Sequence, residues 1–173
     1  MADEGPGKPP EVEVRRSERR QRTVSARLKD GKLVVYLPAR MSPAEEAEWV
    51  EKMAARFQAR SLRRQLNSDG DLQRRALELN REYFEGKLKW SSLTYVTNQN
   101  NRFGSCSPAD ATIRISAALA TMPSFVRDYV IVHELAHLEE PNHSAAFWKL
   151  VNRYPLTERA RGYLMGKGMD EAT

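Results

Sequence analysis

The sequence contains little cysteine and little histidine, and it has no long hydrophobic run. The single Cys106 cannot form an intramolecular disulfide, which excludes the small disulfide-framework proteins and indicates a reducing compartment. No stretch approaches the roughly 18 apolar residues that span a bilayer. The first ten residues also lack the apolar core of a signal peptide. We therefore expect a cytoplasmic protein without a membrane segment.

The excess of positive charge is small. The 28 Lys and Arg against 23 Asp and Glu give a net charge of +5, which permits nucleic acid as a partner but supports it only weakly. The arginines at 56, 60, 63, 64, 74 and 75 could form a nucleic-acid patch, but a solvated helical face is favoured, since acidic residues also occur along this region and Arg is a good helix former. Lys87, Lys89 and Trp90 resemble a single-strand platform, but a packed Trp at the entrance to a strand is favoured.

Local patterns in the first half of the chain predict a hairpin followed by helices. Asp30-Gly31 separates two alternating runs, which predicts strands at 23–29 and 32–38 joined by a type I′ turn. Ser42-Pro43-Ala44-Glu45 has the pattern of a capping box, and we expect a helix from 43 to about 60. A second amphipathic helix follows and ends at Gly86.

The second half predicts short strands near 93–97 and 112–116 and then helices, so the fold class is α+β. Residues 1–22 contain few large apolar side chains, and we expect most of them to be disordered, although the later part could join the sheet. We predict one domain over 23–165 and a flexible tail over 166–173. The oligomeric state is not predicted.

A strongly apolar helix after Pro123 carries two imidazoles and one carboxylate. Such groups are costly to bury unless they are paired or bind a metal. His133 and His137 are four residues apart, so both can reach one Zn²⁺ from the same helical face. Glu134 follows the first histidine and can serve as a general base. This His-Glu-x-x-His pattern predicts a catalytic zinc site.

A third ligand is needed, and His143 is the leading candidate. Pro141 should end the helix at or near Glu140, and a chain that turns back there can return His143 to the metal. His143 could instead open the next helix. Glu158, on a later charged segment, is the rival ligand. Cys106 could be a nucleophile or a ligand, but a small buried residue is the favoured interpretation.

Several of these segments resemble the YgjP-like metallopeptidases, which are relatives of the SprT and Wss-type zinc proteases. The resemblance rests on the zinc motif, on Pro141-Asn142-His143, on Phe147-Trp148 and on the stretch 101–106, where Phe103 replaces the family's usual Trp. It implies a compact zincin-like domain with a short antiparallel sheet and an active-site helix. It also implies zinc on His133, His137 and His143, with Glu134 as the catalytic glutamate. The family's substrates do not identify a target.

These observations predict a zinc-dependent metallopeptidase that acts on a peptide or protein substrate. Candidates for a second oxyanion stabiliser are chosen by residue type alone: Arg153, Tyr154, Arg159 and Tyr163. An extended substrate could add to an edge strand of the 93–117 region. The alternatives are a nucleic-acid-associated zinc protein, such as an SprT-like protease acting on DNA-bound proteins, and a catalytically silent zinc domain.

Overall fold

The computed structural model describes residues 10–99 and 102–167. The chain divides into two compact units, residues 1–62 and 63–173, where the sequence predicts one domain over 23–165. The predicted tail residues 1–9 and 168–173, and Asn101 of the family-like stretch, lie outside the described residues. Within the described ranges, none of the helices combines the length and the apolar character needed to cross a bilayer.

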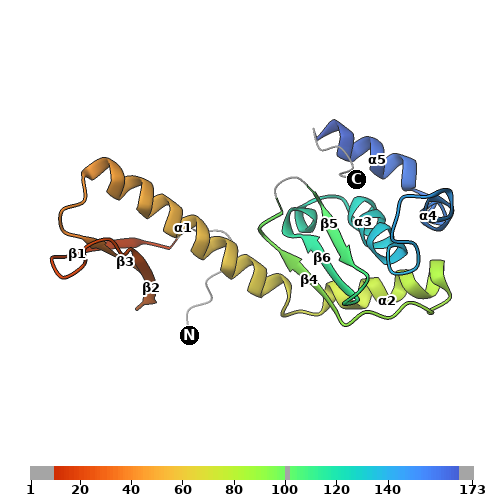
Figure 1. Ribbon diagram of the computed structural model, residues 1–173, viewed down its shortest axis with the longest axis horizontal. Coiled ribbons are helices and arrows are strands. Elements are labelled where there is room, and N and C mark those ends of the chain that lie inside the picture. Colours follow the sequence, from red (N-terminus) through yellow and green to blue (C-terminus); the bar gives the residue numbers. More distant parts are fainter. Residues whose placement is uncertain (1–9, 100–101, 168–173) are drawn as a thin grey trace. The chain divides into compact units, whose positions relative to one another are not determined.

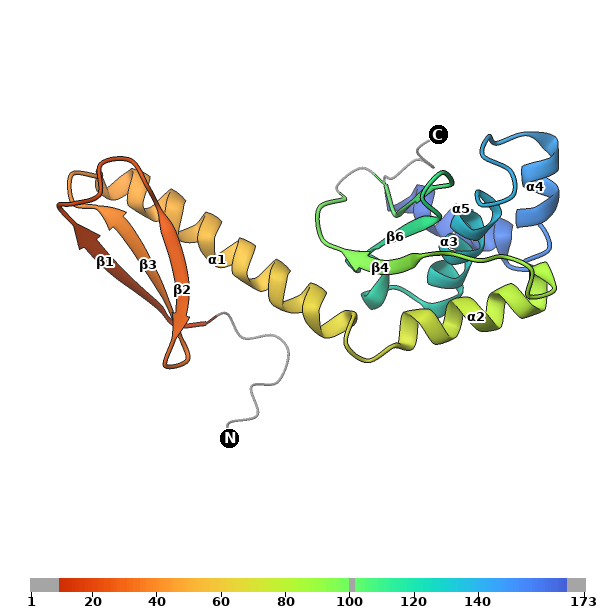
Figure 2. The ribbon, with the colours of Figure 1, turned by 60° about the horizontal axis from the view of Figure 1, so that its bottom comes forward.

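The first unit is a three-stranded sheet with one covered face. Its strands are β1 (Val12–Ser17), β2 (Ser25–Lys29) and β3 (Lys32–Pro38), in the order β1-β3-β2. β1 runs parallel to β3 and β2 runs antiparallel to it. The helix α1 (Pro43–Leu66) lies along one face (Figure 2), where its apolar side chains pack on Leu33, Val35 and Leu37.

The local signals in this unit are confirmed. Asp30 and Gly31 both have positive φ, 51° and 77°, as a type I′ turn requires. The Ser42 backbone N–H donates to the Glu45 carboxylate at 2.9 Å, and the Glu45 N–H donates to the Ser42 hydroxyl at 3.3 Å, which completes the capping box. The later part of the 1–22 segment joins the sheet, as the sequence allowed, since Val12–Ser17 forms β1. Pairing with β3, which lies some twenty residues later, orders this segment.

The second unit packs helices against a mixed sheet. Its strands are β4 (Ser92–Val96), β5 (Gly104–Ser107) and β6 (Thr112–Ser116), in the order β4-β6-β5. β4 is parallel to β6 and β5 is antiparallel to it, so the short sheet is not purely antiparallel. A 3-10 turn, η1 (Ala117–Thr121), leads from β6 into α3 (Ser124–Ala136). The α+β class is confirmed.

The central element of this unit is α3. It contacts α2 (Asp71–Phe84), α4 (Ala145–Val151), α5 (Thr157–Gly166), β5 and β6 (Figure 1). Ile131 and Leu135 are fully buried between the helices and the sheet, together with Ile113, Ile115 and Phe147. This surrounding core explains why α3 is apolar on nearly every side.

A buried ion pair joins α2 to α3. The Arg75 guanidinium donates to both carboxylate oxygens of Asp128, at 3.1 and 2.9 Å, and the Asp128 side chain is only 8% exposed. Arg75 also contacts Glu78, and Arg127 contacts Asp71 on α2. The bidentate geometry fixes the relative placement of the two helices.

Two helix ends differ from the prediction. α1 continues to Leu66 instead of ending near residue 60. α3 ends at Ala136, four residues before the predicted end at Glu140, and His137 is its C-cap. The N–H of Leu138 donates to the carbonyl of Leu135 and that of Glu139 to Ala136, so the chain tightens into i→i+3 turns before Pro141 is reached.

Candidate metal centre

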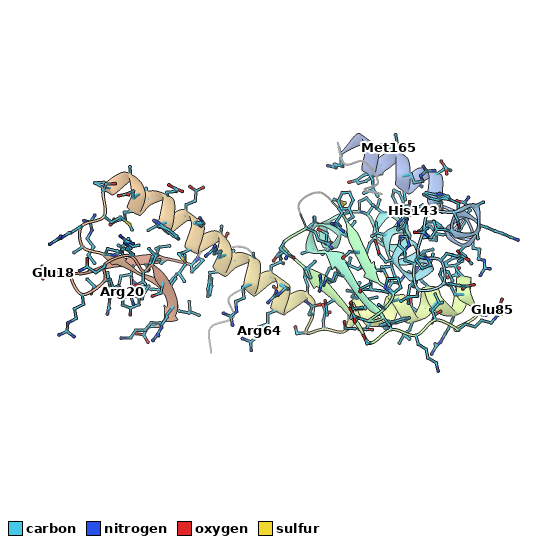
Figure 3. The ribbon with its side chains drawn as sticks, in the orientation of Figure 1. Glu18, Arg20, Arg64, Glu85, His143 and Met165 are labelled. Carbon is cyan, nitrogen blue, oxygen red and sulfur yellow. The ribbon has the colours of Figure 1, made fainter. Side chains whose placement is uncertain are left out.

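The last turn of α3 carries the first part of the site. His133 and Glu134 lie within the helix and His137 is the residue that caps it. All three face a part of the molecule enclosed by β5 and α4, both of which contact α3. The turn at 137–140 then leads to His143, which lies directly before α4 (Figure 3).

The three histidines converge on one point. Each offers one ring nitrogen, and these atoms all lie within 4.8 Å of one another. The Nε2 atoms of His143 and His133 are 3.1 Å apart. Two nitrogens bound to one tetrahedral Zn²⁺ at 2.0–2.1 Å would be separated by about 3.3 Å. The donor atoms therefore have the chemistry and the spacing of a metal site.

The surroundings favour the neutral form of His133 and His137. Burial lowers the pKa of His133 to about 3, with further lowering by His137, His143 and Arg161. Burial also lowers the pKa of His137. His137 Nδ1 lies 3.1 Å from the Glu140 carbonyl oxygen, so Nδ1–H donates to that oxygen and Nε2 keeps its lone pair. Neutral imidazoles with free lone pairs are the form that binds metal.

The Glu134 carboxyl is held in a tight, apolar space. The residue is 5% exposed, and its Oε2 is buried with no hydrogen-bond partner among the described residues. Burial raises its pKa to about 8, and Arg102 opposes this rise. A methyl group added at Gly104 on β5 would lie 2.3 Å from Glu134 Oε1. Glycine at this position therefore makes room for the carboxyl.

Aromatic rings line the histidine cluster on the α4 side. Phe147 stacks on His137 with ring centroids 4.4 Å apart, and Trp148 stacks on His143 at 5.8 Å. The Arg161 guanidinium of α5 lies 4.9 Å from the centre of the Trp148 ring. These contacts hold the rings in place, and Arg161 brings a positive charge to the rim of the site.

The rival metal ligand lies elsewhere. Glu158 is 80% exposed and pairs with Arg161 at 3.0 Å, and it is not part of the three-histidine group. Cys106 lies on β5 near Glu134, and burial, assisted by the Glu134 charge, raises the pKa of its thiol to about 12. A thiol with such a pKa is a poor nucleophile, which agrees with a packing role.

The candidate oxyanion stabilisers contact other groups. The Tyr154 hydroxyl donates to the Phe125 carbonyl at 3.1 Å, and Arg153 donates to the Tyr83 carbonyl at 2.7 Å. Arg159 and Tyr163 both lie against the Phe125 ring, at 4.6 and 6.1 Å from its centre. Trp90 is packed against the core and its indole N–H donates to Gln73.

The sequence analysis missed the contributions of Gly104 and Arg161. Gly104 matters because β5 passes close to α3, a contact between residues thirty positions apart. Arg161 reaches the cluster through Trp148 from a helix whose placement depends on the core. The only available signal was the Phe103-Gly104-Ser105 stretch in the family resemblance.

Comparison with known families decides the identity of the domain. The model of the YgjP-like metallopeptidase domain matches residues 37–165, which include the whole histidine cluster. The chain belongs to the YgjP-like family. The match runs from the end of β3 into α5, and it confirms the resemblance noted in the sequence. No curated protein sequence matches the chain significantly.

A solved structure supports the YgjP-like fold. The crystal structure of the metallopeptidase zymogen of Pyrococcus abyssi abylysin is similar with a TM-score of 0.50. The two chains are 17% identical, and the likeness covers 58% of this chain and 99% of the other. At this identity the likeness concerns the fold. Much of this chain has no counterpart in the smaller protein.

Proposed function

We propose that this YgjP-like domain is a zinc-dependent peptidase with His133, His137 and His143 as metal ligands and Glu134 as general base. The observation that carries the proposal is the convergence of three imidazoles beside a buried carboxyl, whose Oε2 has no hydrogen-bond partner among the described residues. A group of only three protein ligands leaves a coordination position for water or substrate, as catalytic zinc sites do.

The residues fit zinc better than a harder cation. Three imidazole nitrogens suit Zn²⁺, whereas Mg²⁺ and Ca²⁺ prefer oxygen ligands. Among the described residues, the buried oxygen ligand next to the histidines in the sequence is the Glu134 carboxyl. A divalent cation beside it would lower its pKa from about 8, because the anion is then stabilised by the positive charge.

The residues of the chain have separate tasks in hydrolysis. When bound, zinc would supply Lewis-acid chemistry, polarising the scissile carbonyl and acidifying a water molecule. Glu134 takes a proton from the attacking water and delivers it to the leaving nitrogen. Because burial raises its pKa to about 8, the Glu134 carboxyl can both accept and donate a proton near neutral pH. β5 is an edge strand beside Glu134, and an extended peptide could pair with it.

The test combines metal analysis with hydrolysis of an unfolded protein substrate. Glu134→Gln should keep its zinc and its fold and lose at least about a hundredfold in rate, because a general base contributes 10²–10⁴. His143→Ala should lose zinc, whereas Glu158→Ala should retain it. Full zinc retention in His143→Ala, or unchanged hydrolysis in Glu134→Gln, would contradict the assignment.

A further inference from the structure

The strands of the first unit carry a local excess of positive charge. Residues 10–40 contain nine Lys and Arg against four Asp and Glu, an excess equal to the +5 of the whole chain. The following helix α1 carries four glutamates between residues 45 and 51 and five Lys and Arg between residues 52 and 64, so its net charge is only +1. The net charge is therefore not spread over the chain, as its composition alone would suggest.

The basic residues lie on the sheet face that α1 leaves uncovered. Leu33, Val35 and Leu37 point toward α1, so alternation places Lys32, Val34 and Tyr36 on the other face. The register aligns Arg15 of β1 with Tyr36, Arg27 of β2 with Val34, and Lys29 with Lys32. We call this set the open face, and its basic members are Arg15, Arg27, Lys29 and Lys32.

Electrostatic coupling confirms that these residues share one face. The pKa of Glu13 is lowered by its hydrogen bond with Arg15 and by the charges of Lys32 and Lys29. Glu13 on β1 therefore senses bases that belong to the other two strands. It is paired with Arg15 at 2.6 Å, and Lys32 is paired with Glu11 at 2.8 Å.

Several positive charges on and beside the open face are uncompensated. Arg27 and Lys29 are exposed and form no ion pair with any described residue. The β1–β2 loop adds Arg19, Arg20 and Arg22, and the Arg20 guanidinium lies 5.3 Å from the centre of the Tyr36 ring. Figure 3 shows Arg20 beside the strands of this sheet. The loop thus extends the basic surface.

We propose that the open face binds the phosphate backbone of a nucleic acid without sequence specificity. Arg27 and Lys29 are two residues apart on β2, so their side chains leave the strand about 6.7 Å apart. The charges of one DNA strand follow one another at about 3.4 Å along the helix axis, so two side chains at this separation can each reach a phosphate of the same strand. Binding through such contacts is driven by the release of counterions and needs no base readout.

The same surface is poorly suited to a membrane. Interfacial binding to lipid requires apolar side chains that insert beside the basic ones. The aliphatic residue of the open face, Val34, is only 1% exposed. Charge without an insertable apolar group favours a nucleic acid. The proposal concerns residues 10–40 and does not depend on the peptidase function.

The test measures DNA binding by the full-length protein. Fluorescence anisotropy would follow a labelled oligonucleotide, single-stranded and duplex, at salt concentrations from about 50 to 200 mM. Arg27→Gln/Lys29→Gln removes two charges from the open face. Arg56→Gln/Arg60→Gln removes two exposed, unpaired charges from α1 in the same unit and is the matched control. Circular dichroism and thermal melts would check that both variants are folded.

The two variants should differ clearly. The open-face variant should lose about tenfold or more in affinity, and its log–log salt slope should fall by about 1.4 to 1.8, because each phosphate contact contributes 0.7 to 0.9. The α1 variant should bind like wild type. If the strand variant is unfolded, Arg19→Gln/Arg22→Gln in the loop tests the same surface and should also weaken binding.

Other outcomes would overturn the proposal. Equal losses in the open-face and α1 variants would mean that net charge alone determines binding. Absence of DNA binding by wild type at the lowest salt would exclude the site. Stronger binding to anionic phosphatidylserine vesicles, or displacement of DNA by polyglutamate at equal charge, would assign the surface to a lipid or to an acidic protein.

Discussion

Replacing Gly104 by alanine should displace the carboxyl of Glu134. The added Cβ would lie 2.3 Å from Oε1 and 2.7 Å from both Cδ and Cγ of Glu134. Separations below 3.0 Å are not found for real Cβ atoms, so the side chain or β5 must move. Gly104 lies in a strand, and its φ is outside the left-handed region, so the backbone itself accepts alanine. The perturbation is therefore purely steric.

The expected loss can be estimated from this clash. Overpacking a filled site costs about 1–3 kcal/mol of stability, and a carboxyl moved away from the attacking water forfeits a factor of 10²–10⁴ in rate. We expect Gly104→Ala to lower kcat by about a hundredfold or more. Zinc content should not change, because the three atoms nearest to the added methyl group all belong to Glu134, which is not a proposed metal ligand.

The assay has an internal control on α5. At Gly162 a Cβ would meet nothing within 4 Å, so Gly162→Ala should keep full activity and gain about 0.5–1 kcal/mol from helix propensity. Hydrolysis, zinc content and melting temperature would be measured for both variants. Glu134→Asp should partly relieve the clash, so the stability loss of the double variant should be smaller than the sum of the single losses. Wild-type hydrolysis by Gly104→Ala would refute the reasoning.

Two further predictions concern stability. Asp128→Ala should cost about 1.5–3 kcal/mol in urea unfolding, since it removes two charge-assisted hydrogen bonds from Arg75, which keeps Glu78 as a partner. Removing the exposed Glu158 carboxyl should cost less than about 1 kcal/mol. In the metal-free protein the folded-state pKa of Glu134, about 8, exceeds its unfolded value. The free energy of unfolding should therefore fall as the pH rises from about 6.5 to 8, by up to about 1.4 kcal/mol per pH unit. Below pH 6.5 the lowered pKa of His133 makes the free energy of unfolding rise with pH, which opposes the effect of Glu134. The Glu134→Gln variant, treated with a chelator to remove metal, should not lose stability over this pH range. A pH slope equal to that of the wild type would contradict the argument that burial raises the pKa of Glu134.

The features that the sequence predicted well depend on neighbouring residues. The Asp30-Gly31 turn, the Ser42 cap and the spacing of His133 and His137 are local, so a short window contains the physics that determines them. The return of His143 was also predictable, because Pro141 limits where the chain can go. Its Nε2 atom lies 3.1 Å from that of His133.

The features that were missed depend on long-range packing. The sequence allowed the later part of 1–22 to join the sheet, but nothing within Val12–Ser17 indicates its parallel pairing with β3. α3 ends early because i→i+3 turns replace its last helical turn, which a proline five residues later does not predict. The tight approach of Gly104 to Glu134 and the position of Arg161 over Trp148 arise only once the core is assembled.

The early end of α3 has a consequence for metal affinity. The aligned peptide dipoles of a helix place a partial negative charge of about half an electron at its carboxyl end. Because α3 ends at Ala136, this charge lies next to His133 and His137 and not a full turn beyond them. A cation held there gains about 0.3–1 kcal/mol from the helix dipole, or roughly a two- to fivefold increase in affinity. The backbone of α3 thus favours a cation at the point where its side chains supply the ligands.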